Sequence, residues 1–415
     1  MVRKKSVLIS FFLLLTVFCS YAQDTISLMA YNLLKYSSIN QNRNRYLDLR
    51  KVVQETKPDI LMVCELLETS AAQFLLDSAV NAAGIGTYSR AAVFDGPDTD
   101  NMLYYNTQKV TFRSQKQIIT VLRDISQYVV YKTISPGDTA FLYLHMAHLK
   151  AGNTSADENQ RNSEISAFCS AVSTLPSRAN VIIAGDFNLK SNTEPAWYTL
   201  TNTCSHVMYD PIDQQGYWNN NSDYSAIHTQ STRSSGFNGC CGGATGGLDD
   251  RFDFIMHNIN VKEGKSRVRY VNGSYVAVGN DNLHFNKSII EAPANAVVSP
   301  ALSQALFNMS DHLPVMMKLE ISSELNSVEE WVSRKKLNVK PLSSNNIIIE
   351  TGIDGTHTID IMNLSGQLIY TNSENFRPGT HQINLNDKVL PNNMYIITVG
   401  TESAVKRIKY ISSGD

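Results

Sequence analysis

Short apolar segments that each end in a polar residue recur through residues 24–321 of this chain. The clearest is VIIAGDFN, in which a β-branched apolar run leads into Gly185, Asp186, Phe187 and Asn188. Such a run is typical of a strand that is buried on both faces. Because side chains alternate between the two faces of a strand, we expect Asp186 and Asn188 to point the same way. Gly-Asp is also common in turns, so this segment alone leaves both interpretations open.

The same pattern occurs in five further segments. Their polar residues are Asn32 in ISLMAYN, Glu65 in DILMVCE, His148 in FLYLHMAH, Asp253 in DDRFDFI, and Asp311 with His312 in SDHLPV. Each segment alone also fits an ordinary polar strand end. A carboxylate between two phenylalanines, as at Asp253, is expected to be buried, and a buried carboxylate needs a partner. Six such ends together indicate a functional site, since sites are built where loops meet a rigid sheet.

Many short strands and few helices predict an α+β fold with stacked sheets and helices outside them. Helical spacing of apolar residues predicts helices over 44–57 and 158–175. The predicted strands are 26–32, 59–65, 101–106, 116–122, 128–134, 140–149, 180–188, 251–259 and 313–321.

The two ends of the chain differ from this middle part. Residues 1–22 combine a basic start, an apolar core and a small-x-small site, and they predict a secretory signal peptide cleaved near Ala22. A lipoprotein anchor at Cys19 is disfavoured by the bulky Phe18 before it. No other long apolar run occurs, so we expect a soluble, exported protein without a transmembrane segment. Residues 322–338 are polar and are expected to form a linker, and 339–415 predict a small β-sandwich.

Charge and cysteine content narrow the possibilities further. The formal net charge of -2 does not mark a nucleic-acid binder, so any recognition of phosphate must be local. Cys64 lies in an apolar strand and is expected to be a buried free thiol. In an exported protein we expect Cys240 or Cys241, in a glycine-rich loop, to form a disulfide with Cys204. No CxxC pair suggests a metal site at the cysteines.

The residue types at the strand ends suit the hydrolysis of a phosphodiester. Oxygen ligands such as Glu65, Asp311 and the Asn32 amide favour Mg²⁺ or Ca²⁺ over zinc. The reaction also needs a group that aligns and deprotonates water, and donors for the phosphoryl oxygens, which Asn and protonated His supply.

The polar strand ends lie in the motifs MAYNLLKY, ILMVCELLE, HMAHLKAG, IIAGDFNL, LDDRFDFIM and MSDHLPVM. In these motifs the chain resembles the endonuclease/exonuclease/phosphatase family, which includes deoxyribonuclease I. The resemblance covers residues 24–321. It implies a four-layer α/β-sandwich, in which two stacked sheets are flanked by helices, and a divalent cation, Mg²⁺ with Ca²⁺ or Mn²⁺ as alternatives. Where the family often has Gln before the metal-binding Glu, this chain has Cys64.

On the metal side, the resemblance implies that Glu65 is the principal ligand, with Asn32 beside it and Asp311 at the edge. Asp186 would position or deprotonate the attacking water, or share the metal.

On the phosphate side, the resemblance implies that Asn188 bonds the scissile phosphate. His312 would contact the phosphate, and Asp253 would orient His312 and keep it charged. His148 matches a second histidine of the deoxyribonuclease-like branch, which assists the leaving group or the phosphoryl oxygens.

The stretch GYWNNNSDYSAIHTQSTR contributes three candidate substrate-binding residues. Trp218, with the neighbouring Tyr217, offers a surface on which a base can stack, and Arg233 offers a contact to a phosphate; His228 is the third candidate, without a specific contact. The alternative is an ordinary packed loop.

The C-terminal segment resembles the type A sorting domain of the type IX secretion system. The resemblance rests on NIIIE, IDIMNLSGQLIYT, LPNNMYIITV and VKRIKYI, and it implies contact with the secretion machinery and a secreted or cell-surface protein reached via the periplasm. An adhesive or carbohydrate-binding sandwich is the alternative.

Together these features predict an exported, metal-dependent phosphodiesterase, and they favour a monomeric nuclease acting on extracellular DNA rather than RNA. Two alternatives remain open. One is a phosphomonoesterase or a sphingomyelinase-like phospholipid phosphodiesterase of the same fold, although no exposed apolar hairpin is evident from the sequence. The other is an inactive binding module.

Overall fold

The computed structural model describes residues 24–135, 137–237, 241–322, 337–343, 346–364, 367–377, 379–385, 393–401 and 405–412. The predicted signal peptide lies outside these residues, as does most of the predicted linker. Among the described residues, no helix is both long enough and apolar enough to cross a membrane.

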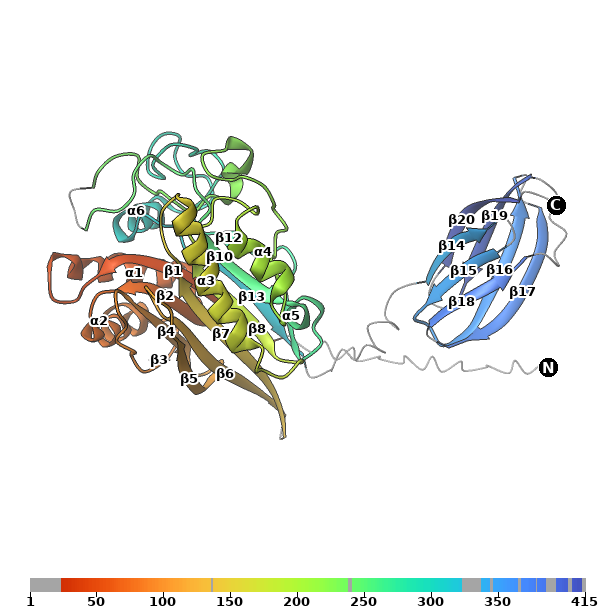
Figure 1. Cartoon of the computed structure of the whole chain (residues 1–415), viewed down its shortest axis with the longest axis horizontal. Coiled ribbons are helices and arrows are strands. Elements are labelled where there is room, and N and C mark those ends of the chain that lie inside the picture. Colours follow the sequence, from red (N-terminus) through yellow and green to blue (C-terminus); the bar gives the residue numbers. More distant parts are fainter. Residues whose placement is uncertain are drawn as a thin grey trace, which may run out of the picture.

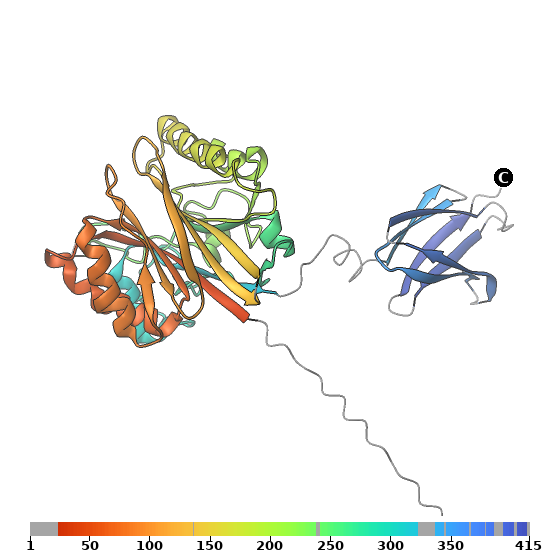
Figure 2. The same ribbon diagram turned by 90° about the horizontal axis from the view of Figure 1, so that it is seen from below.

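Two sheets form the core of residues 24–322 (Figures 1 and 2). The first sheet has the order β11 (Val268–Tyr270), β13 (Val315–Ile321), β1 (Asp24–Tyr36), β2 (Ile60–Leu66), β4 (Asp100–Asn106) and β3 (Tyr88–Arg90), with β12 (Val276–Ala277) paired to β13. The second sheet has the order β5 (Thr111–Ile118), β6 (Ile125–Ser135), β7 (Asp138–His148), β8 (Asn180–Asp186), β10 (Asp253–Asn258) and β9 (Met208–Tyr209).

Helices cover the outer faces of the two sheets (Figures 1 and 2). The helices are α1 (Tyr46–Thr56), α2 (Thr69–Leu75), α3 (Ser155–Val172), α4 (Pro195–Tyr198), α5 (Ile259–Glu263) and α6 (Pro300–Met309). Short 3-10 or π turns are η1 (Gln41–Arg45), η2 (Leu76–Val80), η3 (Asn81–Ala83), η4 (Thr199–Thr203) and η5 (Ser222–Ile227). The predicted layered fold of stacked sheets with helices outside is confirmed.

Alternation along β8 explains how one strand serves two layers. Ile182 and Ala184 belong to the core between the two sheets, whereas Val181 and Ile183 belong to a second core that includes α3 residues. All four side chains are fully buried. Each contributes roughly 1.5–3 kcal/mol relative to an exposed position, with Ala184 contributing less. A strand with this pattern has no solvent-facing side, as its continuous apolar sequence predicted.

Helix α3 begins three residues before the predicted start at 158, because Thr154 caps it. The Thr154 side chain accepts a hydrogen bond from the Asp157 backbone N–H, and the Asp157 carboxylate accepts one from the Thr154 N–H in return. This capping box satisfies two backbone donors that a helix otherwise leaves unpaired.

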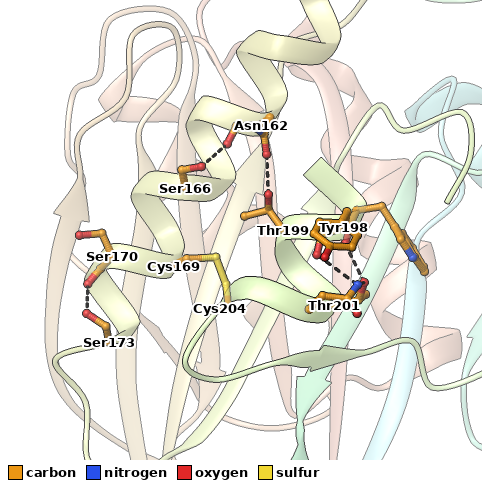
Figure 3. Close-up of a disulfide and its surroundings, with 11 residues drawn as sticks. Asn162, Ser166, Cys169, Ser170, Ser173, Tyr198, Thr199, Thr201 and Cys204 are labelled. Carbon is orange, nitrogen blue, oxygen red and sulfur yellow. Dashed lines mark hydrogen bonds between the residues drawn. A yellow bond between two sulfur atoms is a disulfide. The ribbon is translucent and has the colours of Figure 1, made fainter. Parts of the chain in front are cut away.

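The prediction that Cys204 pairs with Cys240 or Cys241 is wrong. Cys204, which follows η4, is bonded to Cys169 on α3, with the two Cα atoms 4.9 Å apart (Figure 3). The two segments also share a hydrogen bond, from the hydroxyl of Thr199 to the side-chain oxygen of Asn162, at 2.7 Å. Cys64 is a buried free thiol, as predicted. Cys241 takes part in another disulfide, and Cys240 lies outside the described residues.

The C-terminal strands form two small sheets that share one core. One sheet has the order β14 (Leu337–Ser343), β15 (Asn346–Thr351) and β18 (Gly379–Asn384). The other has the order β17 (Leu368–Phe376), β16 (Gly355–Asn363), β19 (Asn393–Gly400) and β20 (Val405–Ser412). Ile349 of the first sheet and Ile359 and Ile397 of the second lie fully buried in that core. The predicted β-sandwich is confirmed.

Candidate active site

Strand directions bring the polar strand ends to one edge of the two sheets. β1 runs parallel to β2, so Asn32 and Glu65 both lie near the carboxyl end of their strands. β7 runs parallel to β8, and His148 is the register partner of Asp186. β10 is antiparallel to β8 and begins at Asp253, which also pairs with Asp186. Within each sheet these residues therefore lie at one end, and a hydrogen bond from Asn32 to Asp186 shows that the two ends lie side by side.

His312 reaches the same edge from the first sheet. It lies three residues before β13, which runs antiparallel to β1 and pairs its first residue with Ala30. The segment before β13 therefore lies near the carboxyl end of β1.

Two backbone features shape the strand ends at the site. Gly185 has a φ of 131°, and a Cβ atom built there would lie 1.9 Å from the backbone oxygen of Ala147. Only glycine allows β7 and β8 to approach this closely at their ends. Glu65 and Asn188 adopt left-handed φ values of 63° and 51°. Non-glycine residues rarely adopt this conformation, and it is concentrated at functional sites.

The side chain of Asn32 joins two carboxylates. Its Nδ2 donates to Glu65 Oε1 at 2.9 Å and to Asp186 Oδ2 at 3.0 Å. Its oxygen accepts from the Leu34 backbone N–H at 2.9 Å, which fixes the orientation of the amide. Asn32 therefore presents nitrogen rather than oxygen to the carboxylates. In this geometry its nitrogen links Glu65 and Asp186, and its oxygen, the atom that could bind a cation, accepts from the Leu34 N–H.

Glu65, His148 and Asp186 form a group suited to a cation. One ligand atom from each lies within 4.8 Å of the others. His148 Nε2 lies 3.7 Å from Glu65 Oε1 and 3.5 Å from Asp186 Oδ2, both longer than an ordinary hydrogen bond. Two carboxylates favour a hard cation, and the imidazole widens the choice to metals such as Mn²⁺. This group contains the expected ligand Glu65 together with two residues that were assigned to catalysis.

Burial raises the pKa of Asp186 to about 7. The charge on His312 lowers this pKa, whereas the neighbouring carboxylates Asp253 and Glu65 raise it. The carboxyl group is thus poised to exchange a proton near neutral pH, where a general base is most effective. Burial lowers the pKa of His148 well below its usual value, and Arg123 and His312 lower it further, so His148 is neutral.

His312 is paired with Asp253, as expected. Its Nδ1 lies 2.7 Å from Asp253 Oδ2, and both residues are buried. Because a carboxylate only accepts, Nδ1 carries a proton. Burial opposes the charge on the ring, but the carboxylates of Asp253, Asp186 and Asp311 outweigh it and raise the pKa of His312 well above its usual value.

Asn188 meets Asp186 through a turn and not through strand alternation. β8 ends at Asp186, and Asn188 has a left-handed backbone conformation. The predicted extended strand through Asn188, with both side chains on one face, is therefore not what brings the two residues together. Its backbone N–H donates to Asp186 Oδ1 at 3.0 Å, and its Nδ2 donates to the backbone oxygen of Leu149 at 3.2 Å. The turn fixes the second oxygen of Asp186.

Asp311 lies apart from the group of Glu65, His148 and Asp186. Its Oδ2 accepts from the Ala244 backbone N–H at 2.6 Å and lies 3.1 Å from the amide nitrogen of Gln230. Its Oδ1 is buried and has no hydrogen-bond partner among the described residues. The expected ligand set of Glu65, Asn32 and Asp311 is therefore not gathered into one cluster.

The three expected substrate-binding residues are buried structural residues instead. Trp218 is 0% exposed and its indole N–H donates to the backbone oxygen of Leu189, so it has no face on which a base can stack. His228 is also 0% exposed, with Nε2 2.8 Å from the Trp218 backbone oxygen. Arg233 is 1% exposed and its guanidinium donates to backbone oxygens, including that of Phe307. Burial and these bonds rule out the predicted contacts.

The same stretch contains a residue that sequence reasoning missed. The amide nitrogen of Gln230 lies 2.6 Å from His312 Nε2. A single glutamine in a polar loop carries no recognisable signal, and only the folded loop brings it to the site.

The comparisons with known proteins agree with this fold. The model of the endonuclease/exonuclease/phosphatase family matches residues 29–312, and the model of a secretion system C-terminal sorting domain matches residues 340–413. No curated protein matches the chain.

Similar solved structures include a humanized TDP2 of D. rerio, with 17% identity and a TM-score of 0.46, covering 71% of this chain and 98% of that one. The human Nocturnin catalytic domain has 14% identity and a TM-score of 0.44, covering 72% and 98%. An endonuclease/exonuclease/phosphatase from Bacteroides vulgatus has 14% identity and a TM-score of 0.45, covering 72% and 100%.

The sorting domain indicates a secreted or cell-surface protein. Members of this family hydrolyse phosphoester bonds. Since its model spans more than half of the residues, this chain belongs to the endonuclease/exonuclease/phosphatase family.

Proposed function

We propose that the protein is an exported, divalent-metal-dependent phosphodiesterase that hydrolyses extracellular DNA. The observation that carries this proposal is the pairing of two complementary groups at one sheet edge. A charged histidine with its own carboxylate, His312 and Asp253, faces Asp186, whose Oδ2 lies 3.6 Å from His312 Nε2. Such an arrangement suits a phosphoryl group that is held by a cationic donor and attacked by activated water.

Each residue has a distinct role in this proposal. Glu65 and Asp186 would hold the cation with His148 beside it, and a bound cation would supply charge that neutralises the developing negative charge on the phosphoryl oxygens. Asp186 would align the water and accept its proton at a carboxylate oxygen. His312 Nε2 donates to a phosphoryl oxygen, and Asn188 binds the same group after its amide turns from the Leu149 oxygen. Asn32 keeps the two carboxylates aligned.

A specific observation favours a second candidate, a phospholipid phosphodiesterase. The turn between β5 and β6 exposes Ile119 by 72% and Val121 by 81%. A strand was predicted through these residues, but β5 ends at Ile118. The turn is ordered, since the Thr120 hydroxyl donates to the Arg123 backbone oxygen, and the Arg123 guanidinium in turn donates to the oxygen of Leu149 beside the site. Two exposed aliphatic side chains next to a catalytic edge suit an interface with lipid.

We also propose the arrangement of the chain for export. A signal peptide over 1–22 directs the chain to the periplasm, and the domain over 339–415, joined by a linker over 322–338, directs it to the type IX machinery. The enzyme domain over 23–321 is proposed to act as a monomer. A chain that ends at Ser322 should then keep its hydrolytic rate but remain in the periplasm.

A comparison of substrates tests this proposal. The purified mature chain is incubated with plasmid DNA, RNA, sphingomyelin vesicles and nitrophenyl phosphate, each with Mg²⁺, Ca²⁺ or Mn²⁺ and with EDTA. His312→Ala serves as the site variant, and His381→Ala in the C-terminal sandwich serves as the matched control. Cleavage of DNA that EDTA and His312→Ala abolish, and that His381→Ala leaves unchanged, supports a nuclease. Cleavage of sphingomyelin alone supports the second candidate.

A further inference from the structure

Gln230, which lies outside the predicted set, contacts two residues of the site. Its amide nitrogen lies 2.6 Å from His312 Nε2 and 3.1 Å from Asp311 Oδ2. The amide nitrogen donates to Asp311 Oδ2, but it and the protonated Nε2 of His312 are both donors, so these two nitrogens face each other without an acceptor between them.

The backbone of Gln230 is held firmly on both sides. Its N–H donates to the backbone oxygen of Asp250 at 3.0 Å, and its own oxygen accepts from the N–H groups of Asp249 and Asp250 at 2.9 Å. The N–H of Ser231 donates to the oxygen of Gly247 at 2.7 Å. A side chain presented from such a backbone loses little further freedom when it makes a contact, which suits a residue that must act at a fixed place.

Gln230 is nearer to His312 Nε2 than the other polar side chains around that nitrogen. His312 and Asp311 are each 3% exposed, whereas Gln230 is half-buried. The other polar neighbours of His312 Nε2 are Asn32 Nδ2 at 3.5 Å and Asp186 Oδ2 at 3.6 Å, both beyond an ordinary hydrogen bond. Among these polar neighbours, the Gln230 amide is the one closest to His312 Nε2.

We propose that Gln230 is a further substrate-contacting residue, whose amide N–H donates a hydrogen bond to the phosphoryl oxygen that His312 Nε2 also contacts. The inference rests on the proposed function. Two donor nitrogens 2.6 Å apart can share a single acceptor oxygen that lies about 2.8–3.0 Å from both. One amide N–H remains directed to Asp311 Oδ2, and the other is available to the phosphoryl group. The amide is neutral and transfers no proton, so its contribution is that of a preorganised donor.

Two substitutions separate this role from packing. Gln230→Met keeps a similar volume and removes the donor, and Gln230→Glu keeps the shape but replaces the donor with a negative charge. Gln73→Ala, at an exposed glutamine on α2, is the matched control. The probe is bis(4-nitrophenyl) phosphate with Mn²⁺ or Mg²⁺, and inorganic phosphate is tested as a competitive inhibitor. The melting temperature of each variant reports its folding.

Gln230→Met should lower kcat/KM by about 10²-fold, as expected for the loss of one transition-state donor. Gln230→Glu should lower it at least as far, because a carboxylate repels phosphate. Both should raise the inhibition constant of phosphate, while the control stays within twofold of wild type. If Gln230→Met stayed within twofold of wild type with its fold intact, the inference alone would be overturned.

An increase in kcat/KM for Gln230→Met would also overturn the inference, since the amide would then obstruct His312 instead of assisting it. A wild-type chain that hydrolyses no phosphoester, or a His312→Ala variant with normal activity, would overturn the proposed function and this inference together. The two failures are therefore distinguishable in one experiment.

Discussion

Replacing Asp186 by Asn should stabilise the metal-free protein at alkaline pH while abolishing hydrolysis. Asp186 is 2% exposed, and the pKa of its carboxyl group rises from 3.8 to about 7 on folding. Burial is the main cause of this rise. A group with a raised pKa holds its proton more tightly in the folded chain. Its contribution to stability is complete below about pH 4 and is lost as the pH rises through 7. Asn is neutral and does not incur this loss.

The structure gives the size of the effect. Each pKa unit corresponds to about 1.4 kcal/mol, so ionising Asp186 in the fold costs up to about 4 kcal/mol. Against this, one amide nitrogen of the new Asn faces the Nδ2 of Asn32, which now donates to Asp186 Oδ2 at 3.0 Å. That mismatch costs about 1–3 kcal/mol and does not depend on pH. The stability difference between variant and wild type should therefore grow by roughly 2–4 kcal/mol between pH 5 and pH 8.

Thermal unfolding with EDTA at a series of pH values measures this difference. For a domain of this size the change corresponds to a relative increase in melting temperature of roughly 4–12 °C. Excess Mg²⁺ should reverse the order at pH 8, because a cation bound to the carboxylate stabilises the wild type alone. A difference in melting temperature that is the same at pH 5 and pH 8 would refute the assignment of a raised pKa to Asp186.

Three other substitutions test the remaining contacts. Glu65→Gln should weaken cation binding, so the rate should recover partly as Mg²⁺ is raised, which titration of activity against metal concentration measures. Asp253→Asn and His312→Ala should each reduce the rate by a similar factor, and their effects should be non-additive in the double variant, since the two residues act as one unit through a 2.7 Å contact. Additive losses in rate would show that the two residues act independently. Cys169→Ser should lower the stability of the oxidised protein by about 3–4 kcal/mol, because the disulfide closes a span of 35 residues; an unchanged denaturation midpoint would contradict this.

The strand ends were predictable because the rule that places them is local. An apolar run that ends in a polar residue marks where a buried strand meets solvent, and parallel pairing brings such ends to one edge. Asn32, Glu65, His148 and Asp186 reach that edge through the β1–β2 and β7–β8 pairs. That Asp253 has a partner was likewise predictable, since a buried carboxylate between two phenylalanines requires one, whereas His312 as that partner was implied by the family resemblance.

What could not be predicted depends on how distant loops pack. Cys204 pairs with Cys169 because α3 and η4 lie side by side, which spacing along the chain does not reveal. Trp218 and Arg233 have the residue types of a binding surface, but the folded loop buries both. Gln230 lies between them in the chain and has no distinguishing neighbour in sequence.

The roles within the site were also only partly predictable. The side chain of Asn32 can turn either its nitrogen or its oxygen toward the carboxylates. The Leu34 backbone N–H donates to the oxygen, which leaves the nitrogen for the carboxylates. The Oδ2 of Asp311, an expected ligand, accepts hydrogen bonds from the Ala244 backbone N–H and the Gln230 amide.

The most direct test of the account is a cation-dependent assay of phosphodiester cleavage by the purified wild-type chain, with His312→Ala prepared alongside it. We expect cleavage of DNA that requires Mg²⁺ or Mn²⁺, that stops with EDTA, and that falls by at least about 10²-fold in His312→Ala. Cleavage that persists undiminished in EDTA, or that His312→Ala leaves intact, would contradict the site described above.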